Sequence, residues 1–464
     1  MSVSSIQDST LTHAPYKLSR GAPQIFVALD RIETLNNVRQ IFHPAEKHPS
    51  NPVIRHEKPW EREGGSPAAS MIYDEEEKIF KCWYQGVIGD KEGTTQYGPH
   101  VLCYAISKDG IHWEKPNLGL HEIDGSKKNN VVIPPTYHEG QDHWESVLKD
   151  PLDPDPKRRY KGFGWSSLTQ GLHTMTSPDG LHWTHSPNIV VPGGDSHAMM
   201  IDTLQKRYVV FVRGGAPRGV HYSTDFVNWS PRDNSALDWP HSGSPYNHMG
   251  FVYGDQYLGF VSWFHTDSTD LRFPRIDLHL LASKDGLHSR MVNPVQPVVP
   301  CGEIGEWDRF MTMLTGAPPI RVGNKLHIYY RGFSRRHKPY GIPVSQDTYE
   351  AGALGLATMR VDGFASLGAG FDSGHVTTKP VVFDGSKLFI NTKADFGRVE
   401  VEVLDEGGAV IPGFSKEECL PVTTDNVDSA VAWRDRSDMN SLKGRTVRFR
   451  FYLWNARLYS YQVR

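Results

Sequence analysis

The chain repeats one pattern of apolar and polar residues at five places. An apolar, strand-like run leads into a polar corner, usually Asp-Gly, and an apolar residue follows. The copies are "YAISKDGIHW" (104–113), "TMTSPDGLHW" (174–183), "VHYSTDFVNW" (220–229), "LLASKDGLHS" (280–289) and "LATMRVDGFAS" (356–366). Asp-Gly between two such runs favours a β-hairpin, because glycine adopts the positive φ of the turn without steric cost. The repeated aspartates are therefore interpreted as turn formers.

Two further strand-like runs precede each hairpin, such as "HAMMID" and "RYVVFVRG" before the third copy. Five four-stranded units in succession predict an all-β protein with a five-bladed β-propeller over residues 46–362. No segment keeps a helical period over three turns. The N-terminal segment 1–45 is expected to close the ring with one strand or to cover one end of it.

The pattern changes after residue 362. "SKLFINTKA", "GRVEVEVLDEGGAVIPGF" and "RTVRFRFYLWNARLYSYQVR" alternate apolar and polar residues. Half-buried strands joined by short turns predict a β-sandwich domain over 363–464. No catalytic constellation is visible there, so this domain is interpreted as a packing partner, with carbohydrate binding as the alternative.

Composition excludes some partners. The 464 residues include 38% hydrophobic and 22% charged residues, and the net charge is −3. This balance gives no electrostatic reason to expect nucleic acid or an anionic membrane. Four scattered cysteines form no CxxC motif, and the N-terminus lacks the pattern of a secretory signal. We therefore expect a cytoplasmic protein; the oligomeric state is not indicated.

A propeller directs attention to the start of each blade's first strand, because these ends open on one rim of the central funnel. The segments there are "WERE" (60–63), "DHWE" (142–145), "GDSH" (194–197), "YNH" (246–248) and "EIGEWDR" (303–309). Acids that face each other in such a pocket fit glycosidic bond cleavage, which needs one protonated and one ionised carboxyl. The candidate catalytic residues are Glu145, Asp195 and Asp308.

Other side chains at these strand starts, together with two arginines that end second strands, are candidates for substrate binding. Their tryptophans suit sugar stacking or core packing, and their histidines suit hydroxyl binding, metal ligation on the axis or core packing. No HExxH-type spacing supports a metal, so no cofactor is predicted, with a divalent ion on the axis left open. The candidates are Trp60, Glu61, Glu63, Trp144, His197, Arg213, His248, Trp307 and Arg331.

Three stretches carry a family resemblance. "NPVIRHEKPWE" (51–61), "YDEEEKIFKCWY" (73–84) and the tail "TKPVVF…LFINTKADFGRVEVEVLD…GFS" resemble an uncharacterised family 32-like branch of the propeller glycoside hydrolases of families 32, 43, 68 and 130. The resemblance implies catalytic carboxylates on the early blades, which by position are Glu61 or Glu63, Glu145 and Asp195. The chain departs from family 32 in lacking its Asn-Asp-Pro-Asn and Glu-Cys motifs. Asp150 in "LKDP" is interpreted as a turn residue.

These observations lead to one functional hypothesis with alternatives. The first is a glycoside hydrolase acting on a small carbohydrate, such as a fructoside or arabinoside, with transfer or phosphorolysis as variants of the same chemistry. The second is a metal-dependent lyase or lactonase that uses His197 and His248. The third is a propeller that binds carbohydrate without turning it over.

Overall fold

The structure is a computed structural model that describes residues 14–61, 68–88, 99–135, 142–214, 218–239, 243–265, 275–337 and 352–464. The described residues form β-strands, short 3₁₀ turns and loops, and contain no α-helix, which confirms the predicted all-β class. None of their helical segments has the length and hydropathy needed to cross a bilayer. The chain divides into two compact units, Phe42–Phe364 and a second unit that joins the described residues up to Ile41 to Ala365–Arg464.

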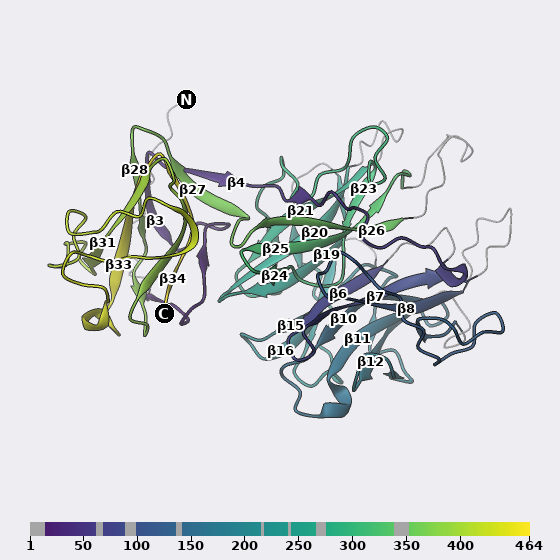
Figure 1. Cartoon of the computed structure of the whole chain (residues 1–464). Helices are drawn as coiled ribbons and strands as arrows, with labels where there is room; N and C mark the ends of the chain where they lie inside the picture. Colours follow the sequence, from purple (N-terminus) through teal and green to yellow (C-terminus); the bar gives the residue numbers. More distant parts are fainter. Residues whose placement is uncertain are drawn as a thin grey trace. The chain divides into compact units, whose positions relative to one another are not determined.

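The larger unit begins with three groups of mainly antiparallel strands, labelled in part in Figure 1. Within each group the strands follow chain order, except that β14 pairs with β12, and each group's first strand contacts that of the next. The first group is β6 (Ala69–Asp74), β7 (Ile79–Val87), β8 (His100–Ser107) and β9 (Val131–Ile133). The second is β10 (Asp142–Lys149), β11 (Tyr160–Ser166), β12 (Gly171–Ser177), β13 (Thr184–His185) and β14 (Val191–Pro192). The third is β15 (His197–Asp202), β16 (Arg207–Val212) and β17 (Gly219–Ser223).

The remaining strands of this unit are joined into one larger sheet through a single β21–β23 pairing. One part contains β18 (Leu237–Asp238), β19 (Ser244–Tyr253), β20 (Gln256–His265), β21 (Arg275–Ser283) and β22 (Ser289–Met291). The other contains β23 (Met311–Leu314), β24 (Ile320–Val322), β25 (Lys325–Phe333), β26 (Ala353–Arg360) and β5 (Glu46–Lys47).

The last strand of this sheet comes from the N-terminal side of the chain. β5 pairs antiparallel with β26, so that Lys47 lies opposite Ala357 and Glu46 opposite Thr358. The structure therefore differs from the expectation for residues 1–45. The pairing residues lie just after that segment, whereas the described residues 16–42 contribute strands to the sheets of the other unit.

Hydrogen bonds from serine hydroxyls tie the first strands of different groups together. Such bonds satisfy polar groups buried between the groups, where an unpaired donor or acceptor would cost about 1–3 kcal/mol. Ser146 on β10 donates to the carbonyl of Gly316, just after β23, and accepts from the amide of Met199 on β15, both at 2.9 Å. Ser70 on β6 donates to the carbonyl of Val147 at 2.6 Å. The amide of Gly316 donates to Ala69 at 2.7 Å.

The repeated hairpins form turns that directly follow strands such as β8, β12 and β17. Asp109 Oδ1 accepts the backbone N–H groups of Ile111 and His112 at 2.8 Å, and Asp179, Asp225 and Asp285 do the same in their own turns. Four of the repeated aspartates are thus turn formers, as predicted. The fifth turn differs, because Asp362 itself takes a φ of 61° and bonds the Tyr253 hydroxyl at 2.6 Å.

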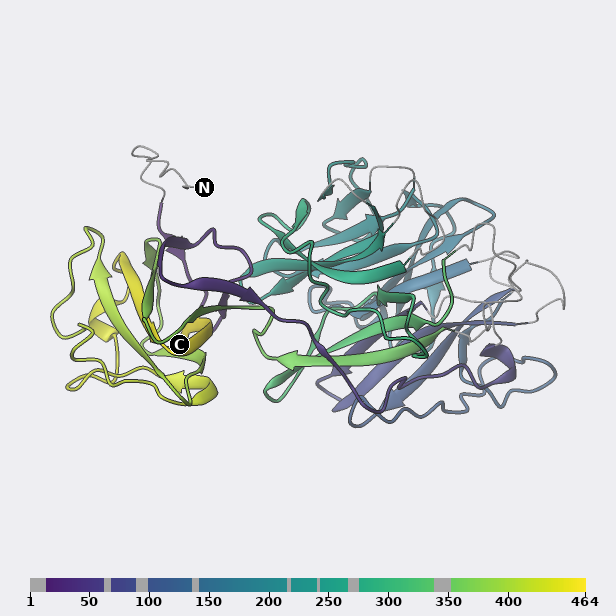
Figure 2. The same ribbon diagram turned by 90° about the horizontal axis from the view of Figure 1, so that it is seen from above.

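The smaller unit contains two sheets that share one core. Figure 2 shows the purple N-terminal segment beside its green and yellow strands. One sheet holds β1 (Tyr16–Lys17), β29 (Val381–Val382), β33 (Val447–Trp454), β28 (Gly374–Thr378), β3 (Ile32–Asn36) and β31 (Arg398–Asp405). The other holds β32 (Asp425–Ala430), β30 (Leu388–Lys393), β34 (Ala456–Val463), β27 (Ala365–Ala369), β4 (Arg39–Phe42) and β2 (Gln24–Ile25). The N-terminal segment belongs here because Leu18 and Phe26 are buried in that core.

Gly316 is expected to tolerate no side chain. A Cβ built there would overlap the carbonyl oxygen of Glu145 and approach Ser146 Oγ to 2.6 Å, and backbone atoms cannot rotate away. We expect Gly316→Ala to lower the free energy of unfolding by about 3 kcal/mol or more. Urea denaturation checks this, with Gly370→Ala as the matched control, because a Cβ at Gly370 meets no atom within 4 Å. Equal stability of the two variants would contradict the packing described.

Candidate functional site

Glu145 lies near the start of β10, where the second and third groups of strands meet the part of the larger sheet that contains β23 and β25. Its side chain is 6% exposed. Oε1 pairs with the Arg331 guanidinium of β25 at 3.2 Å. Oε2 accepts the Ser196 hydroxyl at 2.8 Å and the His197 backbone amide at 2.9 Å. The carboxylate is therefore held by groups from two parts of the chain, Ser196–His197 and Arg331, that are far apart in sequence.

These contacts keep Glu145 ionised. Burial alone would raise the pKa of the carboxyl, because a low dielectric disfavours the charged form. Burial is the largest single effect, but the Arg331 guanidinium, the two nearby histidines and the Ser196 hydroxyl together outweigh it, so the net pKa of Glu145 is lowered from its ordinary value of 4.5. Arg331 is itself fixed, since its Nε donates to the Leu314 carbonyl at 2.8 Å. Glu145 can thus act as a base or nucleophile near neutral pH.

Asp195 is the second carboxylate of this region and is open to solvent. Its side chain is 43% exposed and pairs with Arg213 at 3.3 Å. The Arg213 guanidinium also lies 4.5 Å from the centre of the Tyr246 ring, a cation–π distance. Burial raises the pKa of the Tyr246 hydroxyl, so it stays protonated. Since Asp195 directly precedes the Ser196 that bonds Glu145, the two acids belong to one neighbourhood.

His143 completes this neighbourhood, which we call the strand-start cluster. Burial lowers the pKa of His143, while Glu145 and Asp195 oppose that effect, so the ring senses both acids. The centre of the His143 ring lies 4.8 Å from that of His100 and 5.4 Å from that of Trp165. The strand-start cluster consists of His143, Glu145, Asp195, Arg213, Tyr246 and Arg331.

Asp308, the third predicted catalytic acid, has a different set of partners. It is 1% exposed, pairs with Lys47 of β5 at 2.7 Å and accepts the Tyr330 hydroxyl at 2.8 Å. Trp307 stacks on the Tyr330 ring at 5.7 Å. Asp308 thus fastens β5 to β25.

Asp150 also serves the fold. Its Oδ1 accepts the Leu152 amide at 2.7 Å, which fits the predicted turn role. Its Oδ2 pairs with buried Lys161 at 2.9 Å and accepts the Tyr208 hydroxyl at 2.7 Å. Both oxygens are therefore engaged in structural contacts.

Glu61, a predicted binding residue, is enclosed by its own loop and neighbouring strands. It is fully buried, pairs with Lys115 at 2.7 Å, and accepts the Tyr84 hydroxyl and the Glu57 and Lys58 amides. These contacts fix the 3₁₀ turn Pro59–Glu61 against the first group of strands.

The neighbours of Glu61 in the sequence have separate outcomes. Trp60 donates from its indole nitrogen to the Asn130 side chain at 2.8 Å and packs against the core of the first group. Glu63 lies outside the described residues. Neither observation places a sugar-binding side chain at this strand start.

Three other predicted binding residues are buried in the core. Trp144 is packed in a hydrophobic cluster with Trp83 and Met175. His197 meets the Phe163 carbonyl through Nε2 at 3.2 Å, and burial lowers its pKa. Burial, reinforced by Arg218, lowers the pKa of His248 to about 3. Among the described residues, neither histidine belongs to a group of three metal-ligating side chains.

The cluster therefore keeps Glu145, Asp195, Arg213 and Arg331 from the predicted set and adds two residues that the sequence did not single out. His143 and Tyr246 lie within the strand-start segments, but their neighbours in the sequence carry no charge pattern that selects them. The acids are instead recognised through the arginines that reach them from other strands. Chemically, the cluster offers one fixed carboxylate, one solvent-facing carboxyl and two cations for substrate oxygens.

The smaller unit has a separate hollow of about 580 Å³. Its wall includes Phe396, Arg39, Lys393, Asp395 and Arg457. The Phe396 side chain is 79% exposed. An exposed ring beside polar groups is the arrangement on which sugars stack. It belongs to a unit in which the sequence predicted no catalytic residues.

Comparison with known proteins gives few close relatives. No family model matches the chain. Two proteins of Mycobacterium tuberculosis, both described as uncharacterised, are 38% identical over 55 residues. That match covers 12% of this chain and 18% of each relative, so the chain spans less than a fifth of the curated relatives it matches.

Solved structures are similar over most of the chain at low identity. A glycosyl hydrolase from Bacteroides ovatus has 15% identity and a TM-score of 0.46, covering 69% of this chain and 94% of that one. A β-1,2-mannobiose phosphorylase from Listeria innocua has 10% and 0.45, covering 69% and 97%. A fructofuranosidase from Schwanniomyces occidentalis, complexed with fructosylnystose, has 11% and 0.42, covering 91% and 98%. Likenesses this distant assign no activity to the chain. Any activity has to be argued from the site itself.

The stability that Glu145 contributes should depend on pH. Because its pKa in the folded protein is lowered below 4.5, the contribution is present above that pH and is lost as the pH falls through the folded pKa. We expect the difference in unfolding free energy between the wild type and Glu145→Gln to be constant near neutrality and to shrink on acidification. Urea denaturation from about pH 7 to about pH 3.5 measures it. A difference that is constant, or that grows toward low pH, would refute the ionised assignment.

Proposed function

We propose that the protein cleaves glycosidic bonds of a small carbohydrate at the strand-start cluster. The observation that carries this proposal is the pairing of two carboxyl groups in contrasting environments. Glu145 is buried and fixed beside Arg331, whereas nearby Asp195 faces solvent beside Arg213. Glycosidic cleavage needs one ionised carboxylate and one proton-donating carboxyl, and different environments let two acids divide these roles.

The proposed architecture is a five-bladed propeller followed by a sandwich. The larger unit supplies three successive groups of strands and a ten-stranded sheet that the single β21–β23 pairing divides into two parts, which we interpret as the fourth and fifth blades, with β5 paired to β26 in the last. Hydrogen bonds through Ser146 and Gly316 join first strands of the second, third and fifth groups, as a common axis requires. The two sheets of the smaller unit share one core, which is the arrangement of a sandwich.

The cluster suggests a role for each residue. Glu145 would attack the anomeric carbon or activate water, since its contacts hold it as a carboxylate. Asp195 would protonate the leaving oxygen, because it alone of the two acids reaches solvent. Buried Arg331 would stabilise the negative Glu145 carboxylate, and partly exposed Arg213 would orient substrate hydroxyls. A separation of about 5 Å between the two acids would give retention of configuration, and about 6.5–9.5 Å inversion.

Carbohydrate binding without turnover is the second candidate, and the hollow with exposed Phe396 favours it for the smaller unit. The metal-dependent lyase or lactonase that would use His197 and His248 gains less support, because both rings lie in the core. We propose that a small carbohydrate is the substrate if the protein is an enzyme, and the ligand if it only binds. From the sequence we propose a cytoplasmic location.

Turnover of a panel of small glycosides tests the proposal. We expect Glu145→Gln and Asp195→Asn each to lower kcat by about 100-fold or more, because general acid–base groups contribute about 10²–10⁴. Product analysis with and without phosphate separates hydrolysis from phosphorolysis, and NMR of the first product gives the stereochemistry.

The matched control is Asp285→Asn, which changes the same chemical group in an exposed hairpin turn. Its activity should equal that of the wild type. If Glu145→Gln and Asp195→Asn both keep the kcat of the wild type, these two residues are rejected as the catalytic pair.

A further inference from the structure

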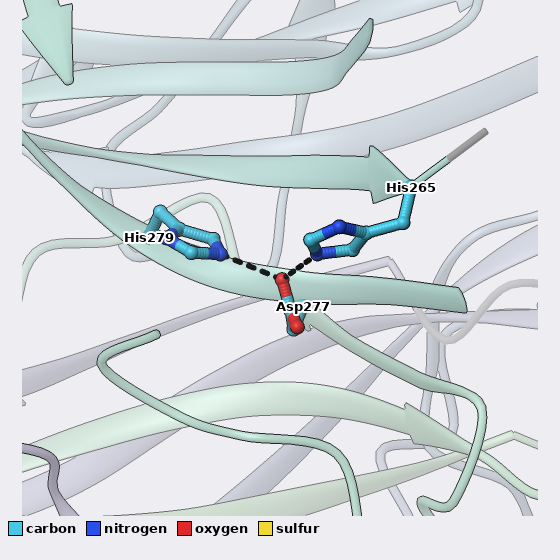
Figure 3. Close-up of side chains that lie close together, drawn as sticks. All are labelled: His265, Asp277 and His279. Atoms are coloured by element: carbon cyan, nitrogen blue, oxygen red, sulfur yellow. Dashed lines mark hydrogen bonds and ion pairs between the residues drawn. The ribbon is translucent and has the colours of Figure 1, made fainter. Parts of the chain in front are cut away.

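A second polar cluster lies on β20 and β21, apart from the strand-start cluster. His265 ends β20, and Asp277 and His279 lie two residues apart on β21. Figure 3 shows the two imidazole rings converging on the same carboxylate. Nε2 of each histidine is 2.7 Å from Asp277 Oδ1. One ligand atom from each of the three residues lies within 4.8 Å of the others.

The second nitrogen of His279 makes this convergence unusual. Its Nδ1 lies 3.3 Å from the backbone carbonyl of Asn293, which accepts but cannot donate a hydrogen bond. A neutral imidazole carries a proton on one nitrogen only. If that proton is on Nδ1 and points to the Asn293 carbonyl, Nε2 directs a lone pair at the Asp277 carboxylate. Either a proton on Nε2 or a metal ion between the two groups satisfies both atoms, and the nearby Nε2 of His265 supplies a second ligand for the metal.

We propose that His265, Asp277 and His279 bind a divalent transition-metal ion, with Zn²⁺ as the expected occupant. Two imidazoles and one carboxylate are a donor set that Zn²⁺ accepts, with a fourth position for water. The Nδ1 contact of His279 to a backbone carbonyl is the outer contact that usually orients a metal-bound histidine. Calcium is disfavoured, because it prefers oxygen ligands throughout.

The geometry needs two adjustments, because the nitrogen–oxygen distances must open and the two histidine ligand nitrogens, which lie within 4.8 Å of each other, must reach the separation of tetrahedral ligands. With bonds of about 2.0 Å, ligand atoms on a tetrahedral ion are roughly 3.3 Å apart. The nitrogen–oxygen distances of 2.7 Å would thus open by about half an ångström, a shift that rotation of the Asp277 side chain supplies.

The surroundings permit entry and favour retention. His265 is 32% exposed, whereas Asp277 and His279 are nearly enclosed, so an ion can enter from the His265 side and then be shielded. Arg275 lies 3.5 Å from the other carboxylate oxygen, Oδ2. It leaves Oδ1 for the metal and provides a second charge partner for the carboxylate. The site does not depend on the proposed glycosidic activity.

Metal binding to the full chain tests the proposal. Protein with its purification tag removed is stripped with EDTA, dialysed, loaded with Zn²⁺ and desalted, and its metal content is measured by mass spectrometry. We expect one Zn²⁺ per chain in the wild type, a higher Tm with Zn²⁺ than without, and affinity weaker by about tenfold or more in Asp277→Asn and His279→Gln. Cobalt bound in place of zinc should show visible absorption bands that these variants lack.

His288→Gln is the matched control, because His288 also contacts two carboxylates, those of Asp233 and Asp285, through both ring nitrogens, but in an exposed turn. It should retain wild-type zinc. If His279→Gln fails to fold, His265→Gln replaces it, since that side chain lies at a strand end and is partly exposed. A wild type that keeps no zinc after desalting, or an Asp277→Asn protein that binds as the wild type does, would overturn the proposal.

Discussion

The buried ion pair between Glu145 and Arg331 is the contact on which the centre of the larger unit depends. Removing one partner of such a pair leaves an uncompensated buried charge, which costs about 3–5 kcal/mol. The chain meets this constraint from several directions. Arg331 is anchored on the Leu314 carbonyl, and Gly316 has no side chain, so its backbone can lie against Glu145. The pair therefore fixes where β10 and β25 stand relative to each other.

The same contact determines what chemistry the region can perform. A carboxylate held by a guanidinium, a hydroxyl and a backbone amide remains ionised in a buried position, so Glu145 is prepared to act as base or nucleophile. Asp195, one residue from the serine that bonds Glu145, remains open to solvent. Structural and chemical roles thus coincide at Glu145, and the start of the third group of strands supplies both Ser196, which bonds it, and Asp195, the second acid.

Sequence reasoning succeeds where a property is local. The Asp109 turn and its repeats follow from residues within three positions of one another, and the position of each first strand then selects Glu145 and Asp195 as candidates. Sequence reasoning does not reveal a contact whose partner is distant in the chain. Glu61 is taken up by Lys115, and Asp308 by Lys47, which no spacing rule connects. The cluster of His265 and Asp277 is hidden for the same reason, since strand pairing and not sequence spacing brings the two strands together.

The most direct test of the account is a crystal structure of Glu145→Gln with the glycoside that the wild type turns over fastest. The account predicts the scissile glycosidic oxygen within hydrogen-bond reach of Asp195, about 2.6–3.2 Å, and the anomeric carbon facing residue 145. A sugar bound beside Asp308, or in the hollow of the smaller unit beside Phe396, with the strand-start cluster empty, would contradict it.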